Sequence, residues 1–173
     1  EKQPKWYELE IPRKVSELSV ASEKAIENGI DVQLKEESAE GANDGVVEHF
    51  DLTSNDQANL SNMFNAIVLG AESYPYHSKD NACRVYTKEE IVKIYVAVML
   101  YITSHQTRFN QLKQLCNSYE GKGDEFESEF RAIEYNMELT GEYLEAYNTM
   151  MLSAQGQIEA VLSKLTSGLS LGS

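Results

Sequence analysis

The sequence is poor in the residues that build covalent or metal-bound frameworks: its 173 residues include two cysteines, three prolines and one tryptophan. Cys83 and Cys116 form no CxxC motif and have no histidine nearby at zinc-ligand spacing, so we expect two free thiols. No apolar run approaches the ~20 residues that span a bilayer, and no signal peptide is visible. The sequence thus predicts neither a disulfide scaffold nor a membrane-spanning helix.

Positive charge is also scarce. The chain has 15 lysines and arginines against 28 acidic residues, a formal net charge of −13. Residues 120–173 hold ten acids and three bases, which gives −7, and residues 1–119 carry the remaining −6. Both halves are therefore acidic and lack the basic face that neutralises phosphates. We expect no nucleic-acid partner and no membrane partner.

Known catalytic and cofactor motifs are missing as well. The three histidines, His49, His77 and His105, fall in an expected strand, turn and helix, without the partner three or four residues away that a metal site needs. No HExxH, GxSxG, P-loop or dinucleotide-binding pattern occurs. We therefore expect no enzyme, no metal and no cofactor.

The chain does contain a long heptad pattern in its last third. Apolar residues alternate in steps of four and three from Phe126 to Leu165, a spacing that places them on one stripe of a helix. This pattern predicts a coiled-coil-forming helix over 124–165. The expected interface comprises Phe126, Phe130, Ile133, Met137, Leu144, Tyr147, Met151, Ile158, Val161 and Leu165.

The partner of this helix lies either within the chain or outside it. A second heptad over 88–119 continues in phase, so one helix over 88–165 competes with a hairpin of two helices. We prefer the hairpin, because Gly121 and Gly123 each cost roughly 1 kcal/mol inside a helix. Positions e and g lack the Glu/Lys pairs of a dimeric zipper, and Tyr143 and Met150 widen the apolar face. We expect a homo-oligomer, with a trimer favoured.

The remaining elements predict an α+β fold, a small helix and β-hairpin module followed by the long C-terminal helix. We expect an extended arm over 1–11, an α+β module over 12–119, and a flexible tail over 166–173. Within the module, a helix over 12–27 precedes strands over 29–34 and 46–52, which alternate apolar and polar residues. Thr53 or Ser54 caps a helix that runs to about Leu69.

A second hairpin pairs residues 74–77 with 83–86. Thr87 and Glu90 then form a capping box, which opens the helix that ends near residue 119. The arm is more apolar than a free tail should be, so we expect it to dock on a partner. The aromatic residues of the arm and of this hairpin are the candidates for docking. These are Trp6, Tyr7, Tyr76 and Tyr86.

The order of motifs from Gly29 to Leu115 resembles an uncharacterised domain of tail-associated proteins in tailed bacteriophages and prophages, mostly of Gram-positive hosts. The blocks GIDVQL, VEHFDLTSNDQANL, YPYHSKDNACRVYTKEEI and ITSHQTRFNQLKQL carry the resemblance. This sequence departs from the family pattern at Asn81, where the family turn has glycine, and in the acidic insert 35–45. The matching positions are Asp31, Val32, Leu34, His49, Phe50, Leu52, Thr53, Asp56, Gln57, Asn59, Leu60, Pro75, Tyr76, His77, Asp80, Cys83, Tyr86, Thr87, His105, Phe109, Asn110, Leu112 and Lys113.

This resemblance implies a virion or tail-assembly context and no particular chemistry. The expected function is a structural subunit of a phage tail, baseplate or tail-fibre attachment, or of a phage-derived injection device. The protein would be made in the host cytoplasm and reside in the virion tail, with other tail proteins as partners. Two alternatives stay open: a tail-fibre assembly chaperone, and a host-surface binding module.

Overall fold

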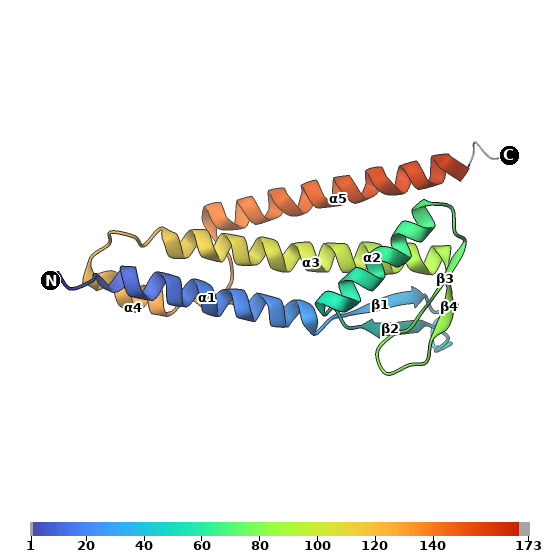
Figure 1. The fold of residues 1–173 in the computed structure, drawn as a ribbon, viewed down its shortest axis with the longest axis horizontal. Helices are drawn as coiled ribbons and strands as arrows, with labels where there is room; N and C mark the ends of the chain where they lie inside the picture. Colours follow the sequence, from blue (N-terminus) through green and yellow to red (C-terminus); the bar gives the residue numbers. More distant parts are fainter. Residues whose placement is uncertain (1, 170–173) are drawn as a thin grey trace. The chain divides into compact units, whose positions relative to one another are not determined.

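The computed structural model describes residues 2–169, with side chains to Leu165. The fold is mixed α+β, with two small antiparallel hairpins and a long C-terminal helix (Figure 1). None of the described helices combines the length and the apolar character that crossing a membrane requires. In order along the chain, the elements are α1 (Trp6–Glu27), β1 (Ile30–Lys35), β2 (Val46–Phe50), α2 (Ser54–Val68), β3 (Ser73–Tyr76), β4 (Arg84–Thr87), α3 (Lys88–Asn117), η1 (Asp124–Phe126), α4 (Glu127–Arg131) and α5 (Gly141–Leu169).

The chain divides into two compact units. Among the described residues, one contains 2–25 and 103–154, and the other contains 26–102 and 155–169. Each unit has its own core of buried apolar side chains. We refer to the first as the helical unit and to the second as the hairpin unit.

The first hairpin of the hairpin unit pairs β1 with β2, as the alternation predicts. Ile30 lies opposite Phe50 and Val32 opposite Glu48, and the register shifts between Gln33 and Lys35. Val32 and Phe50 are buried, and the acidic insert forms the connection between the strands. Gly29 enters β1 with φ of +78°, and a Cβ there would lie 2.0 Å from the Phe50 carbonyl oxygen. This close approach requires glycine.

Both helices that follow the hairpins begin with capping boxes; the one at Thr87 is as predicted, and at the other helix Thr53, one of the two predicted caps, forms a box with Asp56. Asp56 N–H donates to the Thr53 hydroxyl while the Thr53 amide donates to the Asp56 carboxylate, so α2 begins at Ser54. Thr87 and Glu90 make the same exchange at the start of α3. In the second hairpin Tyr74 pairs with Tyr86. The core of the unit consists of Ile26, Val32, Leu34, Phe50, Leu52, Leu60, Met63, Ile67, Tyr76, Tyr86, Ile91, Ile94, Val98 and Ile102.

The expected extended arm over 1–11 is wrong beyond its first residues, because α1 begins at Trp6. The amide of Lys5, just before the helix, donates to the Glu8 carboxylate at 2.8 Å, which fixes the first turn. Pro12 therefore lies inside α1 and not at its start. The loss of one backbone hydrogen bond at Pro12 is offset by burial, because Ile11, Val15 and Leu18 pack in the core of the helical unit.

The expected continuous helix over 124–165 is also wrong. After α3 the backbone turns through Gly121 at φ of +80°, so the predicted break is present and one helix over 88–165 is excluded. Only η1 and the short α4 follow, and α5 begins at Gly141. The helix of α5 extends through residues 166–169 of the expected tail, and residues 170–173 lie outside the described residues.

Side chains from distant parts of the chain explain why the helix is broken. Buried Lys14 donates from Nζ to the carbonyls of Arg131 at 3.1 Å and Ile133 at 2.8 Å. Arg108 donates to the Met137 carbonyl at 2.9 Å. Carbonyls that a continuous helix would use are therefore bound by side chains. The core of the helical unit comprises Leu18, Leu112, Cys116, Tyr119, Phe130, Ile133, Tyr135 and Leu139.

Candidate functional site

The strongest candidate for a functional surface lies on α5. This helix has no charged residue from Ala146 to Ile158, in a chain of which 25% is charged. Large apolar side chains are nevertheless exposed on it: Leu144 by 40%, Met150 by 54% and Leu152 by 68%. Depletion of charge together with exposed Met and Leu is typical of the centre of a protein–protein interface.

One face of α5 gathers most of this exposure. Leu144 and Leu152 are eight residues apart, so they lie about two turns apart on one side of the helix, with Asn148 between them. Met151, half-buried, adjoins this face. We name Leu144, Asn148, Met151 and Leu152 the α5 face. Met150 lies on the other flank of the helix, beyond the apolar stripe.

The C-terminal residues of the expected interface lie on α5 as predicted, with graded exposure. Tyr147 packs against the core of the helical unit, and Ile158 is 9% exposed. Val161 and Leu165 are half-buried, like Met151. Apart from Leu144, these side chains already have neighbours within the chain, so the stripe is partly covered before any partner binds.

The first four residues of the expected interface do not belong to it. Phe130 and Ile133 are buried, at 0% and 3% exposure, in the core of the helical unit. Phe126 and Met137 pack against the same core from η1 and from the segment before α5. Their heptad spacing reflects the requirements of a folded core and not an exposed seam.

The expected docking aromatics are also core residues for the most part. Tyr86 is fully buried and Tyr76 is 9% exposed, so neither can be a contact for a host surface in this fold. Trp6 packs against the core of the helical unit with its ring 5.3 Å from that of Phe130. Its Nε1 donates to the carbonyls of Lys122 and Gly123, both at 3.2 Å. Tyr7 is half-buried, 5.9 Å from Trp6.

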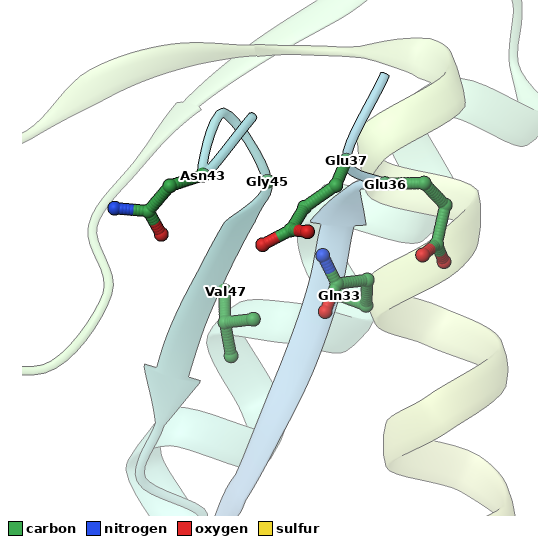
Figure 2. A pocket seen from close by; sticks show the side chains of 6 residues that line it. All are labelled: Gln33, Glu36, Glu37, Asn43, Gly45 and Val47. Carbon is green, nitrogen blue, oxygen red and sulfur yellow. The ribbon is translucent and has the colours of Figure 1, made fainter. Parts of the chain in front are cut away.

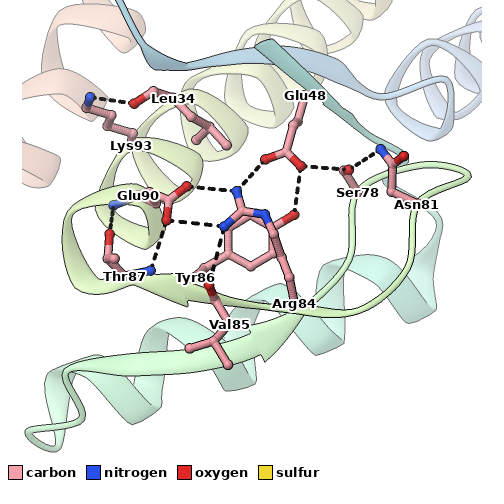
Figure 3. A network of polar contacts seen from close by, with 10 residues as sticks. All are labelled: Leu34, Glu48, Ser78, Asn81, Arg84, Val85, Tyr86, Thr87, Glu90 and Lys93. Carbon is pink, nitrogen blue, oxygen red and sulfur yellow. Dashed lines mark hydrogen bonds and ion pairs between the residues drawn. The ribbon is translucent and has the colours of Figure 1, made fainter. Parts of the chain in front are cut away.

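A polar cluster in the hairpin unit connects its two hairpins (Figure 3). The Arg84 guanidinium on β4 donates to Glu48 on β2 at 2.6 Å and to Glu90 on α3 at 2.8 Å. Its Cζ lies 3.7 Å from the centre of the Tyr86 ring. The Tyr86 hydroxyl and the Ser78 hydroxyl both donate to the other oxygen of Glu48, at 3.2 and 3.1 Å. We name this cluster the Arg84 clasp.

The pKa shifts in the Arg84 clasp are those expected of groups that stabilise the fold. The hydrogen bond from Arg84 lowers the pKa of Glu90, and Glu90 in turn raises the pKa of Arg84. Burial raises the pKa of Tyr86, and raises that of Tyr76 to about 12. These shifts hold each group in its ordinary protonation state at neutral pH, unlike the shifts that prepare an acid, base or nucleophile.

Sequence reasoning missed the clasp, although a signal for it was present. Alternation along β2 places Glu48 on the same side as Phe50, the side that faces the core. A carboxylate at an inward position requires a cationic or hydrogen-bonding partner. Arg84 occupies an equivalent position in the second hairpin, so the pair could have been inferred from the two strand patterns together.

A shallow polar hollow of about 460 Å³ lies where the loop between β1 and β2 closes the first hairpin (Figure 2). Its lining comprises Gln33, Glu36, Glu37, Asn43, Gly45 and Val47. The Gln33 amide already donates to the Lys35 carbonyl. No group of three or more metal-ligating side chains occurs in the part of the chain that the structure describes. The hollow therefore offers carboxylates and amides to solvent without a built site.

The three histidines have separate partners. His49 contacts Asp31 and the Asn28 carbonyl, His77 contacts the Ser78 carbonyl at 3.2 Å, and His105 contacts the Tyr135 hydroxyl at 2.6 Å. Burial lowers the pKa of His105, as expected for a core histidine. Burial also raises the pKa of the Cys116 thiol to about 11, whereas Cys83 is exposed.

Comparison with known proteins gives a family and no named relative. Residues 11–134 match the family described as "Domain of unknown function (DUF4376)". No curated protein and no solved structure matches the chain. The match includes both hairpins and α3, and it ends before α5, so the α5 face lies outside the matched residues.

Proposed function

The chain belongs to the DUF4376 family, whose function is unknown, and we propose that it is a structural subunit that assembles through the α5 face. The observation that carries this proposal is an uncharged helical segment, Ala146 to Ile158, that exposes Leu152, with the exposed Leu144 just before it on the same side of the helix. Burying such a face would remove apolar surface from water at roughly 25 cal/mol per Å². The absence of charge from Ala146 to Ile158 means that no ion must be desolvated there.

The structures in which we place this subunit are a phage tail, a baseplate, a tail-fibre attachment or a phage-derived injection device. This context is supported by the resemblance of residues 29–115 to tail-associated proteins of phages and prophages. The hairpin unit would dock on other tail proteins while α5 assembles. A tail-fibre assembly chaperone would use an exposed helix in the same way, but it would be absent from the finished particle.

The occupant of the α5 face that we favour is a second copy of this chain. Homo-oligomers are the commonest assemblies of soluble proteins, and a parallel or antiparallel α5 pair would bring one uncharged face against another. The exposed apolar side chain of Met150, on the other flank of α5, favours a trimer over a dimer, because a third helix would cover it.

Sedimentation velocity of the full chain tests the assembly. We expect an oligomer in the wild type, and a monomer with unchanged circular dichroism when Leu152→Glu places a charge on the exposed face. Val20→Glu on α1 is the matched control, because Val20 is exposed by 61%, close to the 68% of Leu152. A wild type that remains monomeric up to high concentration would exclude self-assembly through α5.

The biological context has a separate test. Antibody against the purified chain, applied to particles produced by the host that encodes it, should detect the polypeptide in tails. Detection only in lysate, bound to a fibre protein, would assign the chaperone function instead. Absence from both fractions would contradict a role in tails altogether.

A further inference from the structure

His49 in the first hairpin has hydrogen-bond acceptors at both of its ring nitrogens. Its Nδ1 lies 2.7 Å from Oδ1 of Asp31, the residue opposite it on β1. Its Nε2 lies 2.8 Å from the carbonyl oxygen of Asn28 and 3.3 Å from Oδ1 of Asp51. A backbone carbonyl and an ionised carboxylate can only accept hydrogen bonds.

This geometry determines the protonation state that fits the site. Neutral imidazole has one N–H and one unprotonated nitrogen, so it can satisfy either Asp31 or Asn28 but not both. The unprotonated nitrogen would then face an oxygen lone pair at hydrogen-bond distance. Only the imidazolium ion donates in both directions, which makes the contacts of His49 complete in the protonated form alone.

The charged groups around His49 come from every segment that contacts it. Asp31 lies on β1 and Asp51 just after β2, and Asp51 is 3.7 Å from the ammonium of Lys79 in the loop between β3 and β4. The amide of Lys79 donates to the His49 carbonyl at 2.7 Å. Asn28 directly follows α1, where the helix dipole presents its negative end.

The negative charge around His49 exceeds the positive charge, because two carboxylates and a helix C-terminus face one ammonium group. That ammonium group is itself paired with Asp51. The hydrogen bond to Asp31 accordingly raises the pKa of His49, whereas partial burial opposes this effect. The side chain of His49 is 32% exposed, so a proton can reach it from solvent without unfolding.

We propose that His49 is a pH-sensitive clasp of the first hairpin, which ties β1 and β2 to the end of α1 only while its ring is protonated. Loss of the proton removes one of the two donor contacts and leaves Asp31 or the Asn28 carbonyl without its partner. The hairpin then opens more readily at its base. This inference does not depend on the proposed role in assembly.

The direction of the pH effect follows from linkage. Because the folded-state pKa of His49 lies above the ordinary value of 6.5, its contribution to stability is fully present below pH 6.5. It is lost as the pH rises through the raised folded-state pKa. The hairpin should therefore be less protected on the alkaline side of neutrality, opposite to the effect of a buried neutral histidine such as His105.

Nuclear magnetic resonance of the full chain tests the proposal, because the three histidines serve as internal references. We expect the midpoint of His49 to lie above the ordinary value of 6.5, with both ring nitrogens protonated at pH 6 in long-range ¹H–¹⁵N spectra. Asp31→Asn should lower that midpoint while leaving His77 and His105 unchanged. A single protonated nitrogen on His49 at pH 6, or a midpoint at or below the ordinary value of 6.5, would overturn the proposal.

Amide hydrogen exchange tests the mechanical consequence. Between pH 6 and pH 8.5, protection factors of residues 30–35 and 46–50, corrected for intrinsic exchange rates, should fall several-fold in the wild type. They should show no such fall in His49→Gln, and the wild-type fall should persist in the control His77→Gln. If His49→Gln does not fold, Asp31→Asn replaces it with the same expected loss of pH dependence. If the protection factors of these variants fell as much as those of the wild type between pH 6 and pH 8.5, the proposed role of His49 would be refuted.

Discussion

At the scale of single residues, the Arg84 clasp shows why a carboxylate is tolerated on the inward side of a strand. Glu48 is 15% exposed and receives donors from Arg84, Tyr86 and Ser78. Replacing Arg84 by Met would leave Glu48 without its cation and remove the cationic partner of Glu90. A charge-assisted hydrogen bond contributes about 1.5–3 kcal/mol, but Arg84 is 39% exposed, so we expect a loss of about 1–2 kcal/mol at pH 7 in urea unfolding.

The stability that Arg84→Met loses should also depend on pH. Arg84 lowers the pKa of Glu90 below its ordinary value of 4.5, so this part of the stability is present above pH 4.5 and lost as the pH falls through the folded-state value. The difference between wild type and Arg84→Met should therefore shrink in acid. Arg13→Met is the control, because Arg13 forms exposed ion pairs with Glu10 and Glu17 and should give no measurable change. Equal losses from both variants would contradict a special role of the clasp.

At the scale of elements, local signals predicted the hairpin unit and the break at Gly121, and failed in the helical unit at the start of α1 and between α4 and α5. Thr53 and Thr87 define helix starts through contacts three residues away, and strand alternation is equally local, so these features can be identified in the sequence. The break between α4 and α5 depends on Lys14, more than a hundred residues earlier in the chain. A heptad pattern cannot reveal that its carbonyls are bound by such a side chain.

The candidate site was predictable to a similar extent. The heptad identified α5, because an uncharged apolar stripe is visible in the sequence, but it also included Phe130 and Ile133, whose spacing is the same. Periodicity reports that a residue is buried and does not report what buries it. The exposure of Leu152, outside the heptad positions, could be identified only from the folded chain.

Lys14 provides a test of the break at this scale. Lys14→Met removes the donor to the Arg131 and Ile133 carbonyls, and its side chain is 6% exposed, so these acceptors lose their partner in the core. An unsatisfied buried polar group costs about 1–3 kcal/mol, and we expect a loss of about 2 kcal/mol with faster amide exchange over 132–140. Lys24→Met, at an exposed position of α1, should change neither quantity. Unchanged exchange over 132–140 in Lys14→Met would show that other contacts hold the break.

At the scale of the whole molecule, the net charge of −13 opposes any association between copies of the chain. The α5 face contributes none of this charge between Ala146 and Ile158, so attraction at the contact and repulsion between whole subunits have separate origins. Salt acts on only one of them. The screening length falls from about 30 Å at 0.01 M to about 3 Å at 1 M, which removes repulsion between distant carboxylates without weakening apolar contact.

We therefore predict that self-association of the full chain strengthens with ionic strength. Between 0.02 M and 0.5 M NaCl, the association constant from sedimentation equilibrium should rise several-fold, because each added subunit brings thirteen net negative charges. Leu152→Glu should remain monomeric at both salt concentrations, since its defect lies in the contact and not in long-range repulsion. Dissociation on addition of salt would mean that ion pairs hold the subunits together, and the interface would then have to lie on a charged surface away from the uncharged segment of α5.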